Sequence, residues 1–425
     1  MTEPAQTHVV TCFLRHRGAV LLLRRSDKVG SYAGRWGAVA GHAEGDPEAA
    51  AMQEITEETG LDDAVTRVRS GEPFPVTDHA LGTRWVVHPF LFDCTHRDVS
   101  TNWETTEAAW VSPVELLRRD TVPELWTAYE RVAPTVDTVA NDATHGSTYI
   151  SLRALEVLRD RAAVWAHRRS EGDARTALTD CADALLAARP SMTALGNRVH
   201  CVMDACAPDF APRAVSEEAH VAIGRALDAD ADTARRAAGY VAGRAILTLS
   251  RSGTVLDALR HADPPPKHVF ITESRPNCEG VYTAEALAAQ DVDVTVMTEA
   301  AVASVLDDED VEVVLVGADT VLPSGAVVNK TGTRMVATLA QEHGFPCYAA
   351  AAIDKVSTND TPHLEEGPDA AIYDGAAPIR VRNPTFDVTP SNALSGIITE
   401  QGILHPSEIR DVAYELEGLQ RWRAR

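Results

Sequence analysis

Three glutamates at helical spacing are the residues of this sequence best suited to chemistry. Glu54, Glu57 and Glu58 stand at i, i+3 and i+4, so a helix would present three carboxylates on one face. Like charges at that spacing repel one another, and the cluster costs stability unless something binds it. Carboxylate oxygens are ligands for hard divalent cations, and Mg²⁺ commonly bridges from them to substrate phosphates. The alternative interpretation is a solvated acidic face.

A second set of candidate residues follows a series of short β-branched runs. The segments 268–274, 292–299, 311–319 and 346–354 alternate with Ala-rich helical segments, which indicates a doubly wound parallel sheet. Ligands in such sheets bind at the carboxyl ends of the strands. Polar residues cluster at those ends in this sequence, where a site would be. They are Glu273-Ser274-Arg275, Gly317-Ala318-Asp319 and Asp354-Lys355.

Local patterns predict the elements that must position these groups. A capping Asp, a Pro and a Glu at 46–48 favour a helix start, and Gly60 is typical of a helix end. Segment 8–25 has two apolar runs around a His-Arg-Gly turn, which predicts a hairpin, and 83–94 is predicted to be a further strand. Between 149 and 190, apolar residues recur at three- and four-residue spacing, which predicts two helices.

The chain is too long for one ordinary core, since it has 425 residues. Five of its seven Trp precede residue 130, and the polar stretch that follows is predicted to be a linker. We expect an α/β domain at 1–132, a linker at 133–147, a helical subdomain at 148–240 and a Rossmann-like sheet at 241–425.

Composition excludes several classes of protein. The net charge is −23, which argues against a nucleic-acid binder with a basic surface. No apolar run is long enough for a membrane helix, and the N-terminal segment lacks a secretion pattern. Seven scattered Cys without a CxxC pair favour a reduced, cytoplasmic setting. Only four of the 39 basic residues are Lys, and this acidic, Lys-poor composition resembles proteins of salt-in halophiles.

The acidic helix lies in a longer motif. Gly41-His42-Ala43-Glu44-Gly45-Asp46 is followed, after six residues, by Gln53-Glu54-Ile55-Thr56-Glu57-Glu58-Thr59-Gly60-Leu61. This pattern resembles the Nudix box, G-x5-E-x7-REUxEExGU, ahead of Trp110-Val111-Ser112-Pro113. The resemblance implies an α/β/α sandwich with a mixed sheet. It also implies cleavage of a nucleoside diphosphate derivative, with Mg²⁺ or Mn²⁺ held by Glu54, Glu57 and Glu58 and with catalysis by Glu57 and Glu58.

The motif departs from the family pattern at three points. It is two residues short between Gly41 and Gln53, and Asp46 stands where Glu is usual. Gln53 replaces the Arg that normally braces the glutamates. Loss of that cation is expected to leave the carboxylates more repulsive and to weaken metal binding.

Eight short pieces of the chain from about residue 145 onward form a second pattern. They are His145-Gly146-Ser147, Ala188-Arg189-Pro190, Ile246 to Ser252, Thr272 to Pro276, Val316 to Asp319, Asn329 to Thr333, Asp354-Lys355 and Phe386 to Pro390. In this order they resemble the family of initiation factor 2B regulatory subunits, which also holds ribose-1,5-bisphosphate isomerase and methylthioribose-1-phosphate isomerase. The resemblance implies that the C-terminal domains pair into an oligomer and that this part binds a sugar phosphate, although ordinary ion pairs are the alternative role for its cations. The binding residues that it implies are Arg189, Arg275, Asn329, Lys330 and Lys355, with backbone donors at Gly146, Ser147, Ser252 and Gly253.

One substitution leaves the chemistry of this second part open. In the isomerases a Cys and an Asp move protons, and here Asp319 matches the Asp while Ser250 occupies the Cys position. A hydroxyl is far less acidic than a thiol, so Ser250 is a poor proton shuttle without a base beside it. Cys278 could substitute, although packing is its simpler role.

Two hypotheses follow. In the first, a Nudix hydrolase is joined to a domain that binds or isomerises a phosphorylated sugar, and ribose-1,5-bisphosphate isomerase is one form of that activity. In the second, the chain is a non-catalytic regulatory protein that senses nucleotides or sugar phosphates.

Overall fold

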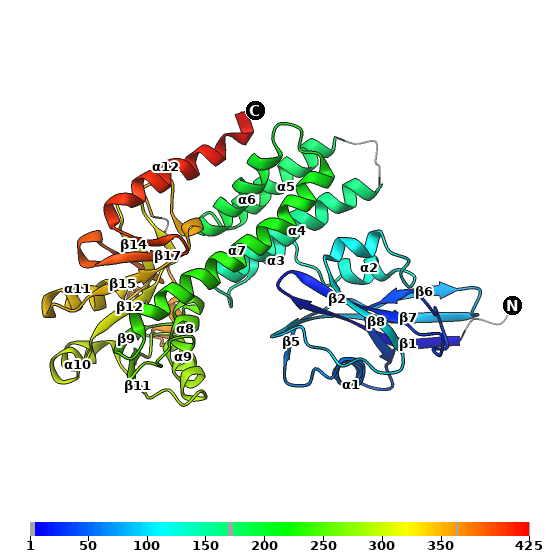
Figure 1. Ribbon diagram of the computed structural model, residues 1–425, viewed down its shortest axis with the longest axis horizontal. Helices are drawn as coiled ribbons and strands as arrows, with labels where there is room; N and C mark the ends of the chain where they lie inside the picture. The colour runs from blue at the N-terminus through cyan, green and yellow to red at the C-terminus, as the bar shows by residue number, and fades with distance from the viewer. Residues whose placement is uncertain (1–4, 169–172, 363, 425) are drawn as a thin grey trace. The chain divides into compact units, whose positions relative to one another are not determined.

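The computed structural model describes residues 5–168, 173–362 and 364–424 (Figure 1). The chain divides into two compact units. The first comprises residues 1–138, 155–181 and 211–224, and the second comprises 139–154, 182–210 and 225–425. None of the described helices is both long enough and apolar enough to cross a membrane.

The first unit is built on a mixed sheet. Its central pair, β1 and β7, is parallel over eleven residues, with Val9 opposite Val87, whereas its other paired strands are antiparallel. The main path runs β3-β2-β1-β7-β5, while β4 pairs with β1, β6 with β7 and β8 with β2. The strands are β1 (Ala5–His16), β2 (Ala19–Arg25), β3 (Trp36–Gly37), β4 (Val39–His42), β5 (Val65–Ser70), β6 (Phe74–Asp78), β7 (Thr83–Cys94) and β8 (Thr105–Val111).

Helix α1 (Pro47–Thr59) begins and ends where its sequence predicts. The Asp46 side chain accepts a hydrogen bond from the Glu48 N–H, and Pro47 opens the helix. Gly60 closes it in a left-handed conformation, φ 69°, in which glycine has no Cβ to clash. The predicted platform for the three glutamates is therefore confirmed.

Two helices cover the two faces of this sheet. Ala51 and Ile55 of α1 pack in one cluster with inward-facing residues such as Leu14. Residues of α2 (Leu125–Glu130) pack on the opposite face in a second cluster that includes Phe13. The alternation of Phe13 and Leu14 between the two clusters is what a strand buried on both faces requires. The α/β/α sandwich is confirmed.

A buried polar network lies within the first unit. Arg15 of β1 donates to Glu156, 3.0 Å away, and Arg159 donates to the Gly18 carbonyl, 2.8 Å away. The Tyr129 hydroxyl donates to Asp160, 3.0 Å away. Nothing in the sequence patterns predicts these pairings. Helical segments outside the sandwich are α3 (Val136–Asn141), which forms within the expected linker, α4 (Ser147–Arg168), α5 (Ala174–Ala188), α6 (Thr193–Cys206) and α7 (Pro212–Val241).

The second unit contains the predicted parallel sheet, in the order β11-β10-β9-β12-β15-β17-β18, with only β18 antiparallel. Its central strands β9 and β12 are fully buried runs, as expected for a sheet covered on both faces. A small antiparallel sheet, β13-β14-β16, lies apart from it. The strands are β9 (Ala245–Leu249), β10 (His268–Thr272), β11 (Val294–Met297), β12 (Val313–Gly317), β13 (Thr320–Val321), β14 (Val327–Lys330), β15 (Cys347–Ala350), β16 (Phe386–Thr389), β17 (Gly396–Thr399) and β18 (Gly402–Leu404).

Helices cover both faces of this second sheet (Figure 1). Leu247 and Leu249 of β9 pack with α10, α11 and α12, whereas Ile246 packs with α7, α8 and α9. The doubly wound, Rossmann-like architecture is confirmed. The helices are α8 (Gly253–Arg260), α9 (Glu279–Ala288), α10 (Val302–Asp308), α11 (Thr333–His343) and α12 (Ile409–Leu419).

Candidate functional site

Two carboxylates of α1 lie against strand β4 in the first unit. Glu58 is 5% exposed and accepts a hydrogen bond from the Ala40 N–H, 3.2 Å away. A Cβ on Gly41 would come within 1.8 Å of Oε1 of Glu54. A side chain at this glycine would therefore have to displace the Glu54 carboxylate from its present position.

Burial and mutual repulsion disfavour the charged form of this cluster. Burial raises the pKa of Glu58 from its ordinary 4.5 to about 8; the Ala40 N–H opposes the rise, and the Glu54 and Glu104 carboxylates add to it. The pKa of Glu54 is also raised, by burial and then by Glu57 and Glu104. A bound cation would offset both causes, and carboxylate oxygens are the donors that Mg²⁺ and Mn²⁺ prefer. The chemistry of the residues therefore fits the implied metal.

Glu57 differs from its two neighbours. Its Oε1 accepts a hydrogen bond from Nε2 of Gln53, 2.7 Å away, so a neutral amide stands where the family pattern has Arg. Within the described ranges, three or more Asp, Glu, His or Cys side chains do not form a ready-made metal cluster.

Glu104 is a fourth carboxylate that the sequence analysis missed. It precedes β8, where its carbonyl accepts the Ser26 N–H at 2.6 Å and its own N–H donates to the Asn102 side chain at 2.9 Å. Its charge acts on both Glu54 and Glu58. No motif marks this position, because it joins the cluster only through the fold.

A cavity of about 630 Å³ adjoins these carboxylates. Glu54 and Glu104 line it, together with Arg25 of β2. Rings of Tyr32 and Trp85 also line it, as do several valines and leucines. This volume lies within the range typical of small-molecule sites, about 300–1,000 Å³, and it places apolar walls beside an anionic end.

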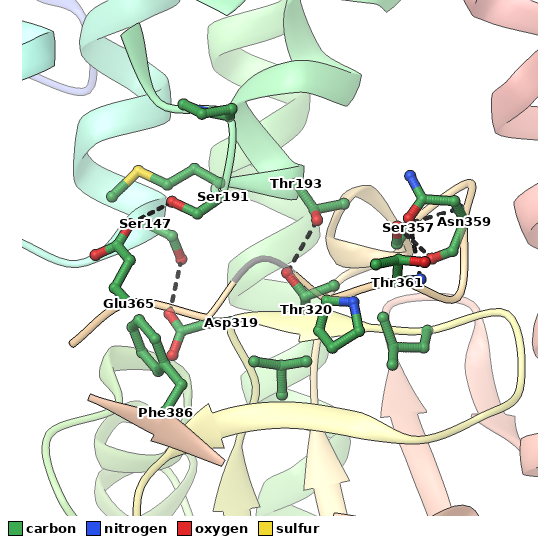
Figure 2. A pocket seen from close by; sticks show the side chains of 15 residues that line it. Ser147, Ser191, Thr193, Asp319, Thr320, Ser357, Asn359, Thr361, Glu365 and Phe386 are labelled. Carbon is green, nitrogen blue, oxygen red and sulfur yellow. Dashed lines mark hydrogen bonds between the residues drawn. The ribbon is translucent and has the colours of Figure 1, made fainter. Parts of the chain in front are cut away.

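The second unit holds a smaller polar pocket of about 100 Å³ (Figure 2). Asp319, which follows β12, lines it with Ser147, whose hydroxyl donates to Oδ1 of Asp319 at 3.3 Å. Thr193 and Thr320 are hydrogen-bonded to each other at 2.9 Å in the same pocket. The fold thus brings together two of the predicted residues from points 172 positions apart.

Burial raises the pKa of Asp319, and Lys355, the Ser147 hydroxyl and Lys330 oppose the rise. Both lysines are therefore close enough to act on this carboxyl electrostatically. Neither lysine lines the pocket itself. Glu365 does line the pocket, and its charge raises the pKa of Asp319, whereas the two lysines lower it. The Glu365 carboxylate also accepts a hydrogen bond from Ser191. Sequence reasoning missed Glu365, which belongs to no motif.

Three of the four predicted phosphate-binding cations are hydrogen-bonded within the protein. Nζ of Lys330 donates to Oε1 of Glu279 at 2.8 Å, and Nζ of Lys355 donates to the Ala318 carbonyl at 2.8 Å. Arg189 donates to the carbonyls of Val139, at 3.1 Å, and Asp142. Arg275 is exposed, as is Gly146.

Ser250 sits in a constrained turn after β9. Its φ is +62°, its N–H donates to the Ser274 hydroxyl at 2.8 Å, and its carbonyl accepts from Thr283 at 2.9 Å. Ser252 caps α8, and a Cβ on Gly317 would come within 2.5 Å of its hydroxyl. These contacts hold the predicted loop. The remaining predicted residue, Asn329, is buried and donates to the Thr333 hydroxyl at 3.0 Å.

Two sequence-family models match the chain, one over its N-terminal part and one over most of the rest. The sequence model of the NUDIX domain matches residues 4–132. That of the initiation factor 2 subunit family matches residues 143–406, more than half of the chain. The chain belongs to the initiation factor 2 subunit family. It carries a NUDIX domain ahead of the family region.

Relatives in this family include named isomerases. The chain is 30% identical over 285 residues to ribose 1,5-bisphosphate isomerase of Methanocaldococcus jannaschii, covering 65% of this chain and 92% of that protein. It is 35% identical over 178 residues to methylthioribose-1-phosphate isomerase of Herpetosiphon aurantiacus, covering 38% and 49%. A crystal structure of translation initiation factor eIF-2B from Pyrococcus horikoshii is 27% identical, with a TM-score of 0.56, and covers 65% of this chain and 97% of that one.

Proposed function

We propose that the first unit hydrolyses a nucleoside diphosphate derivative with Mg²⁺ or Mn²⁺, and that the second binds a phosphorylated sugar. The observation that carries the first part is the buried carboxylate cluster. Glu54, Glu58 and Glu104 come together beside a large cavity inside a NUDIX domain, and burial with like-charge repulsion raises the pKa of Glu58 to about 8. Such a cluster is suited to a divalent cation and a diphosphate.

The reaction is attack of water on phosphorus. The metal supplies Lewis-acid activation of the phosphate oxygens and of water. We assign Glu54, Glu57 and Glu58 to hold it, with Glu57 and Glu58 next to the reacting groups. Glu104 lies outside the helix and lines the cavity. We assign it to accept the proton that the attacking water loses.

Hydrolysis is tested by titrating Mg²⁺ against a panel of nucleotide-sugar and dinucleotide substrates. The acid excess predicts a halophilic protein, so the assay is run in high KCl. We expect a nucleoside monophosphate product from at least one substrate and its loss in Glu57→Gln and Glu104→Gln. A panel without phosphate or monophosphate products, and unchanged by Glu57→Gln, would leave the sensing protein as the better hypothesis.

For the second unit we propose sugar-phosphate binding without efficient isomerisation. Ser250 stands where the isomerases have their Cys, and a hydroxyl is far less acidic than a thiol. Both backbone groups of Ser250 are engaged, so the turn is well defined. Ribose 1,5-bisphosphate should give ketose product with Ser250→Cys and little with the unaltered protein. Equal ketose formation by both proteins would show that Ser250 suffices for isomerisation.

We also propose a cytoplasmic homo-oligomer that pairs through the C-terminal part. All seven cysteines, each within the described residues, are free thiols, which suits a reducing compartment. Light scattering in high salt measures the oligomeric state directly.

A further inference from the structure

The cavity of the first unit is larger than a metal ion and a diphosphate require. Its anionic end carries Glu54 and Glu104, and the rest of its wall mixes apolar and aromatic side chains with polar ones such as Arg25 and His42. Three large aromatic rings contribute: Tyr32 from the loop between β2 and β3, Trp85 from β7, and Trp103 from the loop before β8. A diphosphate has no use for such a wall, whereas a planar organic group does.

Two of these rings are fixed by hydrogen bonds at their edges. Nε1 of Trp85 donates to the Tyr32 hydroxyl at 3.2 Å, and that hydroxyl donates to Oδ2 of Asp78 at 2.8 Å. Oδ1 of Asp78 in turn accepts the Ala80 and Leu81 N–H groups at 2.8 and 3.0 Å. The polar edges are therefore satisfied within the protein. The faces of the two rings are therefore the parts that can contact a ligand.

The backbone at Tyr32 supports a functional role for this arrangement. Its φ is +52°, a conformation that a bulky residue rarely adopts and that persists only where its surroundings hold it. The chain that carries the ring is tied down on both sides, since Arg25 donates to the Ser31 carbonyl at 2.9 Å and the Gly34 N–H donates to the Arg25 carbonyl at 2.9 Å.

Trp103 differs from the other two rings because water reaches most of it. Its side chain is 59% exposed, although it lines the same cavity, and it immediately precedes Glu104. Covering such an exposed aromatic ring with the ring of a ligand removes apolar surface from water and stabilises the complex.

We propose that Tyr32, Trp85 and Trp103 form a stacking subsite for the base of the nucleoside diphosphate derivative. This deepens the proposed function by naming the group that sets substrate affinity. The diphosphate lies at Glu54 and Glu104, and the base occupies the aromatic part of the wall. Recognition through ring faces tolerates different bases, because every base has a π-face.

Binding without metal separates this subsite from hydrolysis. Adenosine, guanosine, cytidine and uridine 5′-monophosphates are titrated into the full chain in EDTA, with ribose 5-phosphate as the ligand that lacks a base. We expect at least one nucleotide to bind at least tenfold more tightly than ribose 5-phosphate. Removal of a stacking ring should weaken that nucleotide roughly five- to 150-fold in Trp103→Ala, while ribose 5-phosphate binding stays the same. Trp103→Phe should recover much of the loss.

Val68→Ala is the matched control, since Val68 is 38% exposed in β5 and does not line the cavity. A fold defect would weaken all ligands alike and would appear in the circular dichroism of the variant. The proposal is overturned if every nucleotide binds no better than ribose 5-phosphate, or if Trp103→Ala and Val68→Ala behave alike. Base binding with no hydrolysis in Mg²⁺ would refute the proposed hydrolase and leave the subsite standing.

Discussion

The carboxylate cavity of the first unit and the polar pocket of the second unit differ in how their charges are balanced. In the first, Glu54, Glu58 and Glu104 share one region, and the charged forms of Glu54 and Glu58 are disfavoured. In the second, Lys330 is paired with Glu279 and Lys355 donates to a backbone carbonyl. The first site thus has an excess of carboxylates, whereas the two lysines of the second already have partners within the protein.

That difference accords with the two proposed functions, hydrolysis in the first unit and ligand binding in the second. Charges held apart from their counter-ions are costly, and they persist where a ligand supplies what is missing. A charged side chain that already has a partner in the protein binds a ligand only when the ligand replaces that partner. The comparison predicts strong effects from changes in the first site and modest, exchange-type effects in the second.

The largest expected effect is on hydrolysis in Glu58→Gln. Loss of a metal-holding carboxylate from the reacting centre should lower kcat/KM roughly 10³- to 10⁴-fold. Glu107→Gln is the control, because Glu107 is exposed on β8 and does not line the cavity. Initial rates in saturating Mg²⁺ measure both. Similar rates for the two variants would show that hydrolysis does not depend on Glu58, and would contradict the difference drawn between the two sites.

The next largest expected effect is on how the free energy of unfolding depends on pH in the absence of metal. Because the pKa of Glu58 is raised in the folded state, its contribution is fully present below pH 4.5 and is lost as the pH rises through about 8. The size of the pKa shift limits this loss of unfolding free energy to about 5 kcal/mol. We expect a loss of about 3 kcal/mol, because the adjoining cavity admits water.

Urea unfolding in EDTA at pH 5 and pH 8.5 measures this loss, followed by tryptophan fluorescence. In Glu58→Gln the difference between the two pH values should shrink by that amount, and Mg²⁺ should restore stability only to the unaltered protein. An unchanged pH dependence in the variant would show that another group destabilises the unit.

The sequence predicted the elements of both sites better than their contacts. Asp46, Pro47 and Gly60 define α1 through local backbone chemistry, so its position and its three glutamates could be predicted. The alternation of buried strands and helices likewise predicted the parallel sheet. These features depend on neighbours in sequence, where periodicity and capping operate.

Contacts between distant residues lay beyond that reasoning. Glu104 joins the carboxylates because the turn before β8 is tied to Ser26, and no motif records that tie. The pairing of Lys330 with Glu279 is similar, since 51 positions separate the two residues. Their sequence neighbourhoods specify only strand and helix ends, and the partner depends on how those ends meet in space.

A smaller effect is expected from Glu279→Gln. Oε2 of Glu279 is buried and has no hydrogen-bond partner among the described residues, whereas Oε1 accepts from Lys330 at 2.8 Å and from Asn277 at 3.3 Å. Lys330 is thus the cationic partner of this carboxylate. Removing its charge releases Lys330 for a ligand phosphate and should tighten ribose 1,5-bisphosphate binding roughly three- to tenfold by calorimetry. Glu285→Gln, at an exposed position of the same helix, should leave the affinity unchanged. Weaker binding in Glu279→Gln would mean that the ion pair builds the site instead of competing for it.

The smallest effect concerns Gln53, the neutral residue beside Glu57. An Arg there would pair with Glu57 at i, i+4 and lessen the repulsion among the glutamates, an interaction worth about 0.3–0.5 kcal/mol. Gln53→Arg should therefore lower the Mg²⁺ concentration for half-maximal hydrolysis about twofold. Gln53→Leu, which loses the 2.7 Å hydrogen bond, should raise it by a similar factor. Opposite shifts would show that bracing of Glu57 limits metal binding in the first site. Shifts in the same direction would show that Gln53 holds Glu57 where the metal needs it, and that the neutral amide is itself an adaptation of this chain.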